Sequence, residues 1–239
     1  MIYTDLDVAH LYTLLNGWSR ADDFYLARVM AAGRVLDVGC GPGQLLRRAR
    51  ATGHAGRLVG VDPDRAALTL ARLDPSIEWH TGVAAAMPFV AEFDLVVMTG
   101  HAFQCFITDD DLVASLAAVH RALVPGGRFA FETRNPARRE WEQWAVGEPF
   151  AITDHRGVPV TVSYQILSLA GDVVTLTETT TGADGRVLRV DEGKLRFIDP
   201  GHLADLLDSA GFSIEARFGD WDETPFGPDA AELITIARA

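Results

Sequence analysis

The chain has little of three things that mark particular classes of protein. It contains two cysteines, Cys40 and Cys105, too few for a disulfide framework or a cysteine-based metal site. No apolar run approaches the length that crosses a bilayer, and residues 1–10 lack the apolar core of a leader peptide. We therefore expect a cytoplasmic protein with no bound metal and no membrane partner.

Positive charge is also scarce. The chain has 21 Lys and Arg against 33 Asp and Glu, a net charge of −12, and Lys194 is its single lysine. A protein that binds nucleic acid without regard to sequence uses clustered Lys and Arg to neutralise phosphates, so we expect no nucleic-acid partner. The 239 residues, 48% of them hydrophobic, suffice for one large α/β domain with a small inserted lobe.

Strand-like and helix-like segments alternate through much of the chain. Strands are expected at 34–38, 57–61, 77–81, 93–98, 127–132, 212–218 and 232–238, and helices at 5–16, 21–32, 43–52, 64–73, 109–123 and 199–210. Strands separated by helices indicate a parallel sheet buried on both faces. Pro125-Gly126-Gly127 predicts a stop and a turn before the fifth strand. Residues 148–198 instead alternate like antiparallel strands, with a hairpin turn at Ala183-Asp184-Gly185.

The segment Val35 to Gln44 carries the strongest functional signal. An apolar run ends near Asp37, and Gly39, Gly41 and Gly43 follow at alternate positions before a helix. Alternating glycines at a strand end let the backbone approach a ligand closely. A dinucleotide fingerprint would place a glycine at Gln44, and a carboxylate at Asp37 would repel a pyrophosphate but attract an ammonium group. This favours S-adenosylmethionine, which carries an ammonium and a sulfonium but no phosphate.

The residues Val-Leu-Asp-Val-Gly-Cys-Gly-Pro-Gly resemble motif I of the class I S-adenosylmethionine-dependent methyltransferases. The resemblance covers about residues 33–134 and 195–239. It implies an α/β fold with a seven-stranded, mostly parallel Rossmann-like sheet, helices on both faces and an inserted antiparallel β lobe. We expect an N-terminal helical lid at 1–32, a cofactor-binding core at 33–134 and 195–239, and a substrate lobe at 135–194.

The same resemblance assigns residues at the neighbouring strand end to the adenosine part of the cofactor. Asp62 ends the second strand and would accept hydrogen bonds from the ribose hydroxyls, with Pro63 near the adenine. Asp62 can alternatively cap the helix that follows, a role that Asp64 can also fill. Gly82-Val83-Ala84 resembles motif III, except that Val83 replaces an aspartate common in the family. Val83 is therefore expected to contact adenine only through its backbone or by van der Waals contact.

Candidate residues for the reacting end follow the fourth and fifth strands. Thr99 and Gly100 are expected at the methionine part of the cofactor, and His101 near the methyl group. His101 can serve as a general base or have an orienting or structural role. Arg134, at the end of the fifth strand, can pair with a substrate carboxylate.

Two aromatic residues ahead of the core, Tyr12 and Trp18, are expected to cover the cofactor and contact the acceptor. Trp141 and Trp144 are expected to fill the interior of the lobe. Neither pair belongs to a recognised motif.

The sequence thus predicts a methyltransferase that acts on oxygen or nitrogen of a small molecule, as a monomer or homodimer. The arginines slightly favour a carboxylate-bearing acceptor, such as a trans-aconitate-like acid, over a sugar or natural-product amine. One alternative is a protein that binds S-adenosylmethionine without transferring its methyl group. A nicotinamide-dependent oxidoreductase is a further alternative, which Asp37 and Gln44 disfavour.

Overall fold

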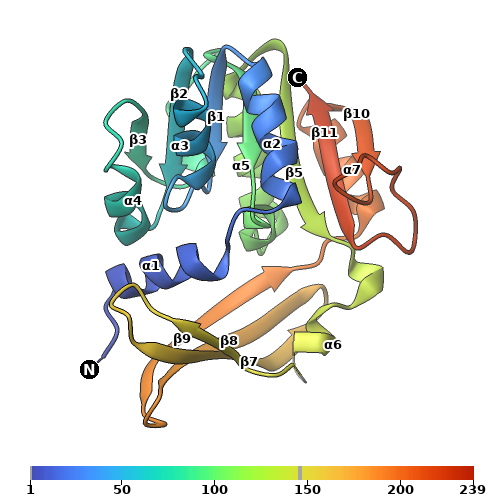
Figure 1. The fold of residues 1–239 in the computed structure, drawn as a ribbon. Helices are drawn as coiled ribbons and strands as arrows, with labels where there is room; N and C mark the ends of the chain where they lie inside the picture. The colour runs from blue at the N-terminus through green and yellow to red at the C-terminus, as the bar shows by residue number, and fades with distance from the viewer. Residues whose placement is uncertain (1, 145–146) are drawn as a thin grey trace.

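Two β-sheets of different kinds organise the computed structural model, which describes residues 2–144 and 147–239 (Figure 1). The larger sheet has seven strands in the order β10-β11-β5-β4-β1-β2-β3. Its strands are β1 (Arg34–Val38), β2 (Arg57–Asp62), β3 (Glu78–Thr81), β4 (Phe93–Met98), β5 (Leu123–Arg134), β10 (Ser213–Phe218) and β11 (Glu232–Arg238). Pairing is parallel except that β11 runs antiparallel to both of its neighbours, β5 and β10.

Helices cover both faces of this sheet. The helices are α1 (Asp5–Leu15), α2 (Arg20–Ala31), α3 (Gln44–Ala51), α4 (Arg65–Ala71), α5 (Asp109–Ala122), α6 (Trp141–Trp144) and α7 (Pro200–Ser209), with short 3₁₀ turns η1 (Ala84–Ala86), η2 (Ala102–Cys105) and η3 (Pro136–Arg138). Apolar residues of α2 and α3 pack on one face, and those of α5 and α7 on the other. Within the described residues, no helix is long and apolar enough to cross a membrane.

The alternation of side chains along β1 assigns its residues to the two faces. Leu36 and Val38 belong to the core beneath α5 and α7, whereas Val35 belongs to the core beneath α2 and α3. Successive strand residues point to opposite faces, so Asp37 lies on the α2 side. The predicted fold class, including the mostly parallel seven-stranded sheet, is confirmed.

The fifth strand begins earlier than predicted. The sequence pattern places a stop and a turn at Pro125-Gly126-Gly127, but β5 runs from Leu123 through these residues. Two hydrogen bonds with Ala239 explain the difference: the Gly126 N–H donates to the Ala239 carbonyl at 2.9 Å, and the Ala239 N–H donates to the Gly127 carbonyl at 3.0 Å. Pairing with Ala239 and β11 therefore continues the strand through residues that favour a turn.

The second sheet is the inserted lobe. Its strands β6 (Phe150–Thr153), β7 (Pro159–Ala170), β8 (Val173–Gly182) and β9 (Val187–Arg196) pair antiparallel in sequence order. The Gly185 N–H donates to the Gly182 carbonyl at 2.9 Å, which confirms the predicted hairpin turn. Trp141 packs with Phe197 and the buried side chains of β8, and Trp144 packs against this cluster, as expected for residues that fill the lobe.

The two helices of the segment 1–32 lie in different layers. Helix α2 packs on the large sheet, whereas α1 packs on β7 through Leu11 and on α4 through Ala9. Figure 1 shows α1 and the lobe lying together across one end of the seven-stranded sheet. Residue 1 of the predicted lid and residues 145–146 of the predicted lobe lie outside the described residues.

Candidate functional site

The carboxyl ends of β1, β2, β4 and β5 lie at the end of the large sheet that faces the lobe (Figure 1). We call this row of strand ends the strand-end edge. In an open α/β sheet, ligands bind beyond these ends, where the strand order reverses. Here the order reverses between β1 and its neighbour β4. Asp37, Asp62, Thr99 and Glu132 all lie at this edge.

The glycine loop after β1 presents one open position. Gly39, Gly41 and Gly43 all have positive φ, at 76°, 51° and 76°. A Cβ at Gly39 would lie 2.8 Å from the Ala102 Cβ, and one at Gly43 would lie 2.4 Å from the Trp79 ring. A Cβ at Gly41 would meet nothing within 4 Å. Packing thus requires glycine at two of the positions, whereas at Gly41 the backbone is open to an approaching ligand.

Asp37 carries a buried oxygen without a hydrogen-bond partner. Its side chain is 1% exposed, and among the described residues nothing donates to Oδ1. Burial, followed by the charges of Asp62 and Glu132, raises the pKa of Asp37 to about 8. Most buried polar groups find a partner, so an orphaned carboxylate oxygen indicates a missing donor. An ammonium group supplies both N–H donors and the opposite charge.

Asp62 connects the glycine loop to the end of β2. Its Oδ2 accepts from the Gly41 N–H at 2.7 Å, and its Oδ1 accepts from the Asp64 N–H at 2.7 Å. The alternative role as a helix cap belongs to Asp64, whose Oδ1 accepts from the first N–H groups of α4, including that of Ala66 at 2.7 Å. An ionised carboxylate has about four acceptor sites, so two remain on Asp62 for donors such as hydroxyl groups.

The residues assigned to adenine lie beside Asp62. The Gly82 N–H donates to the Asp62 carbonyl at 3.0 Å, and a Cβ at Gly82 would meet nothing within 4 Å. Pro63 is exposed, Val83 is 53% exposed, and Ala84 is buried beneath them. The structure therefore brings this group together, with an apolar surface at its exposed side.

Tyr12 of α1 reaches the end of β4. A Cβ at Gly100, whose φ is 65°, would lie 3.2 Å from the Tyr12 hydroxyl. Tyr12 is 45% exposed as a whole residue, so its burial is partial. This partial burial and the charges of Asp62 and Glu132 raise the pKa of Tyr12, so its hydroxyl belongs to the same electrostatic environment. Thr99, directly before Gly100, is half-buried.

Trp18 and Arg134 are held by other partners. The Trp18 indole N–H donates to Asp23 at 2.7 Å, and the Arg48 guanidinium lies 4.5 Å from its ring centre, so Trp18 lies beside α3. Arg134 donates to the Gln104 side chain at 2.8 Å and forms an ion pair with Glu140 at 3.1 Å. Its charge is thus compensated within the protein, which weakens the case for a carboxylate-bearing acceptor.

His101 contacts two acidic residues that sequence reasoning missed. Its backbone N–H donates to Glu132 Oε1 at 2.8 Å, and its Nε2 lies 2.9 Å from Glu232 Oε2. Glu132 is 1% exposed, accepts a further hydrogen bond from the Tyr25 hydroxyl, and has a pKa raised by burial. The position of Glu132 at the end of a predicted strand was a usable signal. The sequence carries no such signal for Glu232, because Glu232 comes to this place only through the pairing of β11 with β5, in which it lies opposite Arg134.

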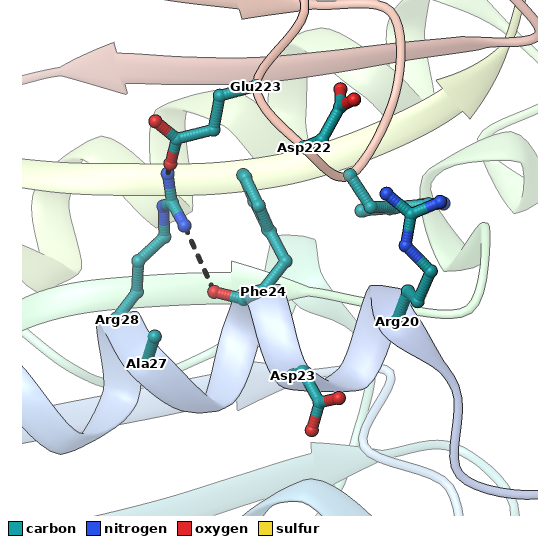
Figure 2. A pocket seen from close by; sticks show the side chains of 8 residues that line it. Arg20, Asp23, Phe24, Ala27, Arg28, Asp222 and Glu223 are labelled. Carbon is teal, nitrogen blue, oxygen red and sulfur yellow. Dashed lines mark hydrogen bonds and ion pairs between the residues drawn. The ribbon is translucent and has the colours of Figure 1, made fainter.

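A separate groove lies between α2 and the loop that follows β10, and Figure 2 shows it. Arg28 crosses it: its guanidinium lies 3.5 Å from the Phe24 ring centre, donates to the Phe24 carbonyl at 3.0 Å and pairs with Glu223 at 2.7 Å. None of the strand-end residues described above lines this groove.

Comparison with known proteins identifies the family of the core. Residues 35–127 match the family model described as a methyltransferase domain. A 2-phytyl-1,4-naphtoquinone methyltransferase of Thermosynechococcus vestitus is 36% identical over 118 residues, which are 46% of this chain and 51% of that protein. A cypemycin N-terminal methyltransferase of a Streptomyces species is 29% identical over 160 residues, 65% of this chain and 58% of that protein. The chain thus spans about half the length of these relatives.

Solved structures with the same fold extend over the whole chain. CalS10, an amino pentose methyltransferase of Micromonospora echinaspora, has a TM-score of 0.72 at 23% identity and covers 100% of this chain and 98% of its own. DesVI of Streptomyces venezuelae has a TM-score of 0.71 at 21% identity, with 99% of each chain covered. The family match over residues 35–127 and the shared fold agree with the resemblance to the S-adenosylmethionine-dependent methyltransferases.

The raised pKa of Asp37 predicts how stability depends on pH. Since the folded protein holds this proton up to about pH 8 and the unfolded chain releases it near the ordinary value of 3.8, stability falls as pH rises between them. We expect this group to lower the free energy of unfolding by up to about 1.4 kcal/mol per pH unit. Chemical denaturation from pH 5 to 8 measures the slope, which should become shallower in Asp37→Asn but not in Glu142→Gln, a change at an exposed carboxylate. An unchanged slope in Asp37→Asn would contradict the account.

Proposed function

We propose that this chain, a class I S-adenosylmethionine-dependent methyltransferase, transfers a methyl group to a nitrogen or oxygen atom of a small-molecule acceptor. The observation that carries the proposal is the orphaned Asp37 oxygen beside the open backbone of Gly41. S-adenosylmethionine, when bound, supplies a methyl group activated by its sulfonium centre.

The strand-end residues fit this cofactor part by part. Asp37 and the backbone near Gly41 suit its ammonium group, and the two free acceptor sites of Asp62 suit the ribose hydroxyls. The exposed apolar surface of Pro63 and Val83 suits the adenine ring, for which Val83 offers no side-chain acceptor. Thr99 and Gly100 lie where the methionine part would extend along the ends of β1 and β4.

The acceptor end supports an amine over a carboxylate. The sequence suggested Arg134 as the partner of a substrate carboxylate, but the charge of Arg134 is already neutralised by Glu140. In the lobe, Glu178 of β8 lies opposite Tyr164 of β7, and burial raises the pKa of Glu178. Among the described residues no arginine, lysine or histidine forms an ion pair with Glu178. A half-buried carboxylate without a cation suits an ammonium-bearing acceptor. CalS10, which shares the fold, is an amino pentose methyltransferase.

Catalysis by this chain would consist of alignment and proton removal. Alignment of acceptor and methyl group supplies much of the rate enhancement in such a displacement. Helix α1 and the lobe lie across the strand ends, where they can exclude water (Figure 1). An amine arrives protonated at neutral pH and must lose a proton before it attacks, and His101 is the base available at this edge.

Cofactor binding provides the first test. Titration calorimetry should detect S-adenosylmethionine binding with a micromolar-scale dissociation constant. Asp62→Ala removes two acceptors and frees the glycine loop. Gly41→Val places a branched side chain in the open space at a residue with positive φ. Each substitution should weaken cofactor binding at least about tenfold. Gly17→Ala, at a glycine with open space and no positive φ, is the control and should bind normally. Absence of binding to the wild-type protein would refute the proposed function.

Turnover provides the second test. Mass spectrometry should detect products heavier by one methyl group with small amines such as amino sugars, and less product with carboxylic acids. His101→Ala should lower kcat by about 10²–10⁴-fold and leave the dissociation constant of the cofactor unchanged. Faster methylation of carboxylic acids would contradict the amine assignment. Binding without turnover across a broad panel would instead favour a protein that binds the cofactor and transfers nothing.

A further inference from the structure

His101 is held at two points by carboxylates on neighbouring strands. Glu132, near the end of β5, accepts from its backbone N–H at 2.8 Å, and Glu232, at the start of β11, lies 2.9 Å from its Nε2. Strands β5 and β11 are paired, and within that pairing Ile234 lies opposite Glu132 and Glu232 opposite Arg134. The two contacts therefore come from one rigid part of the sheet.

The backbone contact holds an unfavourable conformation. His101 has φ 60° and ψ 22°, in the left-handed region that residues other than glycine seldom adopt. Glu132 is itself fixed, since the Tyr25 hydroxyl from α2 donates to it and its side chain is 1% exposed. Strained residues that the surrounding structure holds in place are concentrated at functional sites. This backbone conformation sets the direction in which the imidazole leaves the main chain.

The side-chain contact determines which ring nitrogen is basic. An ionised carboxylate only accepts hydrogen bonds, so the Nε2 that contacts Glu232 carries the hydrogen in the neutral ring. The lone pair of the neutral imidazole then lies on Nδ1. Nδ1 has no hydrogen-bond partner within the part of the chain that the structure describes, and the His101 side chain remains 19% exposed.

We propose that Glu232 is a positioning residue that holds His101 in its Nε2–H tautomer and so makes Nδ1 the atom that accepts the acceptor's proton. The inference rests on the proposed function for the identity of the acceptor. In the step, the N–H or O–H bond of the acceptor breaks, its proton forms a bond with Nδ1, and the electron pair stays on the acceptor atom. The resulting imidazolium is stabilised by Glu232 and later returns the proton to water.

A purely structural ion pair is the competing explanation. Glu232 and His101 lie 131 positions apart in the sequence, so their contact joins the start of β11 to the segment before η2. If the contact is only structural, loss of Glu232 lowers the stability of the fold, and the His101 ring has no preference for one tautomer. The tautomer of His101 therefore separates the two explanations.

Nuclear magnetic resonance of the cofactor-free protein with ¹⁵N-labelled histidine measures that tautomer directly. The signals of His101 are those that are absent from the spectrum of His101→Gln. We expect them to show that the neutral ring of wild-type His101 is in the Nε2–H form. Glu232→Ala should populate both tautomers, and Glu232→Asp should partly restore the Nε2–H form. His202, whose Nε2 lies 3.0 Å from Asp109, is an internal reference and should not change. A wild-type His101 in the Nδ1–H form, or a tautomer indifferent to Glu232→Ala, would overturn the proposal.

Kinetics with an accepted acceptor complete the test. Glu232→Ala should lower kcat about tenfold or more, with KM for the cofactor unchanged and partial rescue in Glu232→Asp. Glu215→Gln, which alters a surface carboxylate paired with Arg128, is the matched control and should retain wild-type kcat. An unaltered kcat in Glu232→Ala would also overturn the proposal. If the wild-type protein methylates nothing, the proposed function fails, whereas the tautomer measurement still decides the role of Glu232.

Discussion

Three buried carboxylates meet at the carboxyl ends of β1, β2 and β5, and in the described residues none forms an ion pair with arginine or lysine. Asp62 and Glu132 accept hydrogen bonds from backbone N–H groups and a tyrosine hydroxyl, but Asp37 has an oxygen with no donor at all. Concentrating negative charge in a desolvated place is costly unless a cation joins it. We therefore propose that the strand-end edge binds a positively charged ligand, and the other assignments depend on that constraint.

The rest of the fold holds these carboxylates where they are. The central strand β1 is paired on both sides, which leaves Asp37 little freedom to turn toward solvent. Helix α2 fixes Glu132 through Tyr25, and the Gly41 N–H fixes Asp62. The same Glu132 holds the strained backbone of His101 and, after burial and the charge of Asp62, contributes to the raised pKa of Asp37, so the candidate base and Asp37 share one electrostatic environment. The lobe and α1 lie across this edge (Figure 1).

Much of the sheet was predictable from the sequence because its signals are local. Apolar runs bounded by breaks predicted strands 34–38, 93–98 and 232–238 with the bounds that the structure has. The glycine loop and Asp62 were likewise visible as a motif. What could not be predicted depends on distant partners. The start of β5 follows from pairing with Ala239, and the charge of Arg134 is neutralised by Glu140. The contact of Glu232 with His101 follows from the order of the strands in the sheet.

The proton count of cofactor binding tests the central claim most directly. With a pKa of about 8, Asp37 is mostly protonated at pH 7, and pairing with an ammonium group requires its ionised form. Calorimetry at pH 7 in buffers of different ionisation enthalpy should therefore show that S-adenosylmethionine binding releases close to one proton, and that Asp37→Asn releases none. Binding with no proton released, or with the same release in Asp37→Asn, would contradict the account.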